Sequence, residues 1–135
     1  MNWKILICLS LFGCMMAYAT VLWIPAETEY YLWPGIFALS AIFIARTSYN
    51  NYFRQGFVLS LLNCFWLAII HCHQADTYIQ SHPQVSAFSS FFHMNEHPRV
   101  ILLFSSISMG IAFGLVQGLL AWIAGSFIRK SAWIS

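Results

Sequence analysis

The stretch VILLFSSISMGIAFGLVQGLLAWIAGSFI, residues 100–128, decides the fold class of this chain. Its 29 residues include no Asp, Glu, Lys or Arg. Because an α-helix rises about 1.5 Å per residue, about 20 apolar residues cross the hydrocarbon core of a bilayer. The stretch is therefore long enough to cross a membrane, either with a tilt or with its first turns standing above the bilayer.

Three more apolar stretches come earlier in the chain, at residues 5–24, 30–46 and 57–72. The first has the length of a full span, and the other two are close to the minimum of about 17 residues. Ala17 and Ala19 have the spacing of a signal-peptidase site, but the apolar run continues past them, which favours a retained helix. We therefore predict a single membrane domain, residues 1–135, that forms an all-α four-helix transmembrane bundle with up-down-up-down topology.

The composition excludes several classes of protein. Hydrophobic residues make up 60% of the chain and charged residues only 7%, whereas a soluble domain has about 25% charged residues. The six basic residues form no stripe of the kind that binds nucleic acid. The P-loop, GxGxxG, GxSxG and HExxH motifs of common enzymes do not occur in the sequence. The lipid bilayer is the partner that this composition predicts, and we expect no nucleic-acid partner.

The basic residues are distributed unevenly between the two sides of the predicted bundle. Arg99 alone falls on the side of the long loop at residues 73–98. The other five fall on the side of the two termini: Lys4, Arg46, Arg54, Arg129 and Lys130. Because cytoplasmic loops carry the excess of Lys and Arg, we expect both termini to be cytoplasmic. The chain contains no N-x-S/T sequon, which agrees with a location in a bacterial inner membrane.

The loop at residues 73–98 is the only long connection between the predicted spans. On the predicted topology it lies on the outer side of the membrane. Apolar residues at Val85, Phe88 and Phe92 follow helical spacing, and polar residues fill most of the positions between them. This pattern predicts a short amphipathic helix that lies on the outer leaflet or folds back over the bundle.

A ridge of small residues runs along the last span. Ser106, Gly110, Gly114 and Gly118 recur every four residues, so they lie on one face of the helix and let another helix approach closely. One interpretation is packing inside the bundle, for example against Gly13 and Ala17 of the first span. Two others are contact with a second copy or a partner subunit, and the lining of a pore.

All five histidines lie between residues 71 and 97. The candidate metal ligands fall into two groups: His71, His73 and Asp76 near the end of the third span, and His93 and His97 before Pro98. Imidazole and carboxylate groups bind zinc and copper, so a site built from both groups is one interpretation. Haem ligation by His71 or His73, a pH-sensing loop, and interfacial histidines that bind nothing are the others. The sequence therefore leaves the cofactor undetermined.

The predicted spans contain no charged residue between their ends. Ionisable groups inside a membrane usually mark proton relays and ion pathways, so their absence argues against a proton-coupled carrier. We expect a small non-enzymatic membrane protein of accessory or structural type, as a homo-oligomer or as a helix-packing subunit of a larger complex. A metal- or haem-binding redox protein is the second hypothesis, and a channel or uncoupled carrier is the third.

Overall fold

The computed structural model describes residues 1–91 and 97–131, and all regular structure in them is helical. Four of the helices are long and two are short. In chain order they are α1 (Trp3–Leu22), α2 (Ala26–Thr47), α3 (Tyr52–His73), α4 (Ala75–Ser81), α5 (Pro83–Phe91) and α6 (Pro98–Ser131).

The four long helices, α1, α2, α3 and α6, are long and apolar enough to cross a membrane. This confirms the prediction of an all-helical chain with four apolar helices of spanning length. All four begin before the apolar stretches that predicted them. In α2, Glu27 and Glu29, which lie between the first two predicted stretches, belong to the first helical turn, where the helix dipole favours acidic side chains.

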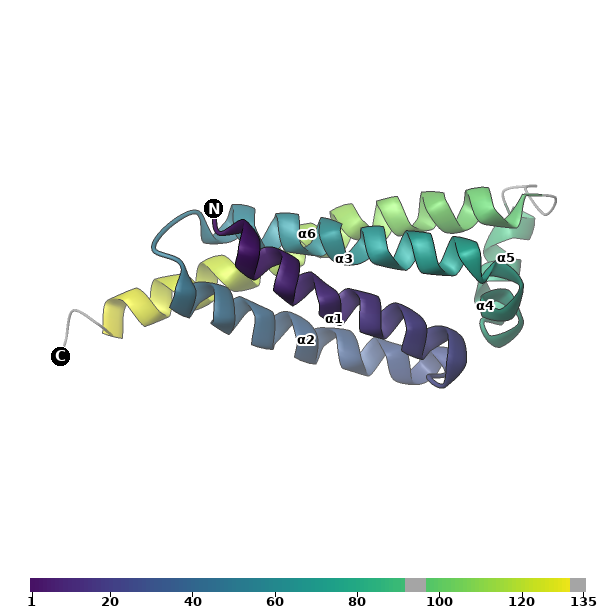
Figure 1. Ribbon diagram of the computed structural model, residues 1–135, viewed down its shortest axis with the longest axis horizontal. Helices are drawn as coiled ribbons and strands as arrows, with labels where there is room; N and C mark the ends of the chain where they lie inside the picture. The colour runs from purple at the N-terminus through teal and green to yellow at the C-terminus, as the bar shows by residue number, and fades with distance from the viewer. Residues whose placement is uncertain (92–96, 132–135) are drawn as a thin grey trace.

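Two helices, and not the single one expected, occupy the loop after α3. Helix α5 covers most of the predicted amphipathic segment, but it begins earlier, at Pro83. Helix α4 was not predicted, because its sequence, ADTYIQS, has only two large apolar residues and no helical period. Both short helices lie across one end of the molecule (Figure 1), which we call the α4 end.

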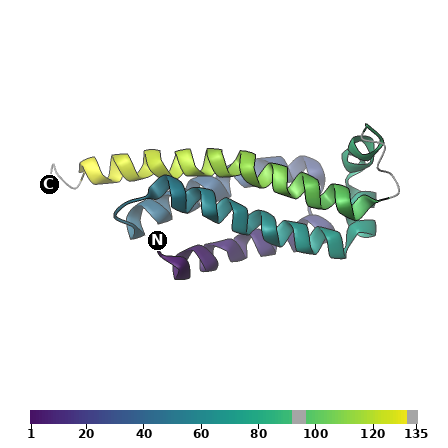
Figure 2. The same ribbon diagram turned by 90° about the horizontal axis from the view of Figure 1, so that it is seen from above.

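The four long helices lie side by side along the long axis of the molecule (Figures 1 and 2). The N-terminus, the connection at residues 48–51 and the last turns of α6 lie at the end opposite to α4. Helix α3 packs most extensively against α6 and then against α1, whereas α2 packs mainly against α6. Because α2 makes few contacts with α3 and α1, space is left beside it in the bundle.

The glycines of the ridge face α3. They do not face Gly13 and Ala17 of α1, which were one possible partner. At each ridge glycine an added Cβ atom would lie within 3.0 Å of an α3 side chain: Cys64 at Gly110, Phe57 at Gly114 and Phe53 at Gly118. Later residues of α6 meet earlier residues of α3, so the two helices are antiparallel. The fourth member of the ridge, Ser106, lines a cavity described below.

Helix α1 also approaches α3 at a glycine. A Cβ atom added at Gly13 would lie 2.8 Å from the Cα atom of Asn63, so the two backbones touch there. Close by, Trp66 Nε1 donates a hydrogen bond of 3.2 Å to Ser10 Oγ. On the other side of the bundle, Gln117 Nε2 donates one of 3.2 Å to the backbone oxygen of Phe37. Small residues and hydrogen bonds between helices are the interactions that hold helices together in apolar surroundings.

Candidate ligand-binding site

Five side chains from different parts of the chain meet at the α4 end, and we call them the polar stack. They come from α1, α2, α3, α4 and the residue after α4: Thr20, Glu29, His71, Tyr78 and His82. The ring of Tyr78 lies between the two imidazoles, with centroid distances of 3.8 Å to His71 and 4.1 Å to His82. The planes of each pair are within 20° of parallel, at 19° and 18°. The stack therefore connects the ends of helices that are far apart in the sequence.

Hydrogen bonds fix the inner end of the polar stack. His71 is buried, and its Nε2 atom lies 3.1 Å from Thr20 Oγ1. The hydroxyl of Thr20 donates its only proton to the backbone oxygen of Ala17, at 3.0 Å. The two contacts together connect His71 to the last turns of α1.

The outer end of the polar stack is a histidine beside an acidic residue. His82 is 1% exposed, and its Nδ1 atom donates to the backbone oxygen of Tyr78 at 3.1 Å. Its Nε2 atom has no hydrogen-bond partner and lies 3.6 Å from Glu29 Oε2, too far for a hydrogen bond. The other carboxyl oxygen, Glu29 Oε1, accepts from Trp33 Nε1 at 3.0 Å. One oxygen of Glu29 is thus held by the protein and the other is not.

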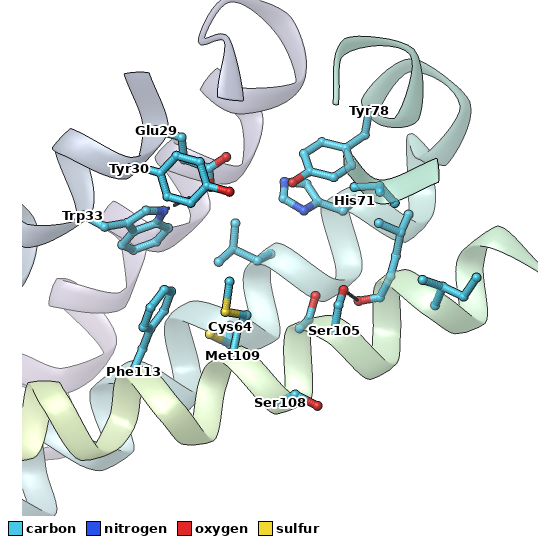
Figure 3. A pocket seen from close by; sticks show the side chains of 15 residues that line it. Glu29, Tyr30, Trp33, Cys64, His71, Tyr78, Ser105, Ser108, Met109 and Phe113 are labelled. Carbon is cyan, nitrogen blue, oxygen red and sulfur yellow. Dashed lines mark hydrogen bonds between the residues drawn. The ribbon is translucent and has the colours of Figure 1, made fainter. Parts of the chain in front are cut away.

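An apolar cavity of about 460 Å³ lies beside the polar stack, between α2, α3 and α6. Glu29, Tyr30 and Trp33 face His71 and Tyr78 across it (Figure 3). The remaining walls are mostly hydrocarbon, sulfur and small hydroxyl groups: Cys64, Leu67, Val85, Ile101, Leu102, Ser105, Ser106, Ser108, Met109 and Phe113. The cavity is therefore apolar with a polar corner at the stack.

The cavity wall carries one acidic group and no strongly basic one. Among the described residues, Glu29 is the only Asp or Glu that lines it, and no Lys or Arg does. Burial raises the pKa of Tyr78, and the negative charge of Glu29 raises that pKa further. The Tyr78 phenol therefore stays protonated at neutral pH and leaves Glu29 as the one acidic group of this wall.

The predicted metal ligands do not meet in the part of the chain that is described. His71 belongs to the polar stack, whereas His73, Asp76 and His97 are exposed. His93 lies outside the described residues, so the complete candidate set stays a prediction. Within residues 1–91 and 97–131, no group of three or more His, Cys, Asp or Glu side chains is placed to hold a metal ion.

Of the five residues in the polar stack, the sequence predicted only His71 as a candidate site residue. The available signal was spacing: Glu29 and Trp33 are four residues apart, as are Tyr78 and His82, which places each pair on one helix face. Comparison of the chain with protein-family models, with curated proteins and with solved structures gave no match. The function must therefore be argued from the geometry of the cavity.

Proposed function

We propose that this chain is a multi-pass membrane protein that binds a small, largely apolar molecule in the cavity beside α2. The observation that carries this proposal is the cavity itself, whose volume of about 460 Å³ falls in the range of small-molecule sites. Such sites combine apolar walls with a few polar groups that orient the ligand. The walls formed by Leu67, Leu102 and Met109 and the polar corner at Glu29 have this composition.

The proposed setting is a bacterial inner membrane, crossed four times with up-down-up-down topology and with both termini in the cytoplasm. The excess of Lys and Arg at the end opposite to α4 supports this orientation. The cavity then lies in the outer half of the bilayer, where an apolar ligand is already concentrated. Binding of this kind suits an accessory role, either alone or as a subunit of a larger membrane complex.

Native mass spectrometry of the protein in nanodiscs tests the proposal with a neutral probe, N-phenyl-1-naphthylamine. We expect a one-to-one adduct with the wild-type protein. Ser106→Phe should abolish the adduct, because the larger side chain fills the cavity that Ser106 lines. Ser126→Phe, the same change on α6 at a residue outside the cavity wall, should preserve it. Absence of an adduct in the wild type, or equal adducts in the two variants, would overturn the proposal.

A further inference from the structure

We propose that the ligand of this cavity is an organic cation, with an ammonium head group attached to an apolar body. This inference rests on the proposed function, since it names the class of molecule that the same cavity binds. Three properties of the wall carry it: its charge, its aromatic rings, and the separation of its polar corner from its apolar walls.

The first property is the acidic group in the polar corner, which has no Lys or Arg among the described residues that line the cavity with it. The side chain of Glu29 is 17% exposed. Its Oε2 atom makes no hydrogen bond within the described residues, and the nearest cationic candidate, His82 Nε2, is 3.6 Å away. Because the surroundings are apolar, a cation beside this oxygen is attracted more strongly than it would be in water.

The second property is the ring of aromatic side chains beside Glu29. Tyr30, Trp33, Tyr78 and Phe113 all line the cavity. The faces of such rings attract ammonium groups, and recognition of quaternary ammonium ligands by several rings is a known use of this attraction. The hydrogen bond from Trp33 Nε1 to Glu29 Oε1 holds one of these rings next to the acidic group. The acidic and aromatic contributions therefore act on the same part of a ligand.

The third property is the apolar part of the cavity on α3 and α6. Leu67, Leu102 and Met109 line the cavity and offer no charged group. A purely ionic ligand such as a metal ion would leave these walls without a partner. An amphiphile fits both parts, because its body is buried against the hydrocarbon walls while its head group meets Glu29.

A matched pair of ligands tests the inference in phosphatidylglycerol nanodiscs. The cation is 3-phenylpropyltrimethylammonium, and the control is the uncharged hydrocarbon in which carbon replaces its nitrogen. Each competes with N-phenyl-1-naphthylamine for the wild-type protein, and the remaining adduct is measured by native mass spectrometry. We expect the cation to bind at least about tenfold more tightly, which corresponds to about 1.4 kcal/mol.

Two substitutions with the same change of charge locate the preference. Glu29→Gln keeps an oxygen that accepts from Trp33, so it should preserve binding of the probe. It should also remove the preference for the cation, so that the two competitors bind about equally. Glu27→Gln, in the same turn of α2 but outside the cavity wall, should leave the preference unchanged. If the wild type binds the probe but prefers neither competitor, or if both variants keep the preference, the inference is wrong while the proposed function stands. If the wild type does not bind the probe at all, the proposed function fails first.

Adding phosphatidylcholine to the nanodiscs identifies the source of the cation. Loss of the probe adduct in wild-type protein but not in Glu29→Gln would assign the site to a choline head group of a lipid. Retention of the adduct in both proteins would assign it to a free amphiphilic amine. Either result supports a cationic ligand, whereas equal loss in both proteins would contradict it.

Discussion

The imidazole of His71 is hydrogen-bonded through Nε2 to the hydroxyl of Thr20, which lies 51 residues earlier in the chain. This contact joins the ends of α1 and α3 next to the cavity. Both residues are buried, at 5% and 1% exposure. His71 is thus held in one orientation, with its ring stacked on Tyr78, and it forms a fixed part of the cavity wall.

Removal of this hydrogen bond should destabilise the protein. Thr20→Val preserves the shape of the side chain but removes the hydroxyl group that His71 Nε2 contacts in a buried site. We expect a loss of about 1–3 kcal/mol in the free energy of unfolding, measured by denaturation in mixed micelles. Thr47→Val is the matched control, because the Thr47 hydroxyl bonds only to Phe43 of its own helix. Equal losses in the two variants would show that the Thr20–His71 hydrogen bond stabilises the protein no more than a hydrogen bond within one helix.

The ridge on α6 should not tolerate large side chains. Gly114→Leu places a bulky group where an added Cβ atom already meets Phe57 at 2.8 Å, so we expect a loss of about 1–3 kcal/mol from overpacking. Gly35→Leu is the control, since no atom lies within 4 Å of a Cβ atom at that helical position. A variant at Gly114 that is as stable as the one at Gly35 would contradict the packing of α6 against α3.

Because the pKa of Tyr78 is raised, the free energy of unfolding should depend on pH in the alkaline range. An unfolded tyrosine ionises near pH 10, whereas folded Tyr78 keeps its proton to higher pH, so the folded protein binds more protons in that interval. The free energy of unfolding should therefore fall above about pH 10, by up to about 1.4 kcal/mol per pH unit. Tyr78→Phe should reduce this slope, which chemical denaturation at several pH values measures, and Tyr31→Phe at an exposed position serves as the control. Identical slopes in wild type and Tyr78→Phe would refute the burial of this phenol.

Much of the fold could be predicted from the sequence, because helices long and apolar enough to cross a membrane are recognised by their length and lack of charge. Residues 100–128 predicted most of α6 in this way. Helix α4 could not be predicted, since the packing of Tyr78 against His71 of α3 is a contact between helices that has no sign in the sequence of α4. The ridge glycines identified a face for close packing, but such a pattern does not say which helix approaches it.

The candidate site was much less predictable than the fold. His71 was identified only as one candidate ligand for a metal or haem, because a single sequence shows the chemistry of an imidazole and not its hydrogen-bond partner. Glu29 lies outside the predicted spans, so its position on α2 beside a cavity could not be expected from the sequence. The cavity itself arises because α2 packs mainly against α6 and leaves space toward α3, which is a property of three-dimensional packing alone.

The proposed orientation places Ser81 on the outer, periplasmic side of the membrane and Asn50 on its cytoplasmic side. Both residues are exposed, so cysteines introduced there should react readily with a membrane-impermeant maleimide that reaches them. In intact cells we expect labelling of Ser81→Cys only, with Asn50→Cys labelled after lysis. The reverse pattern would invert the topology and place the cavity in the inner half of the bilayer.

The most direct test of the central claim is whether a ligand shields the cavity wall at Cys64. This thiol lines the cavity, and the other three cysteines can be replaced by serine to leave it as the only reactive group. The measurement is the rate of its alkylation by N-ethylmaleimide in nanodiscs, with and without N-phenyl-1-naphthylamine. A protein that retains only Cys8, which is exposed on α1 and lies outside the cavity wall, is the control. We predict that the probe slows alkylation of Cys64 at least fivefold and leaves that of Cys8 unchanged; equal rates at Cys64 with and without the probe would contradict a ligand-binding cavity.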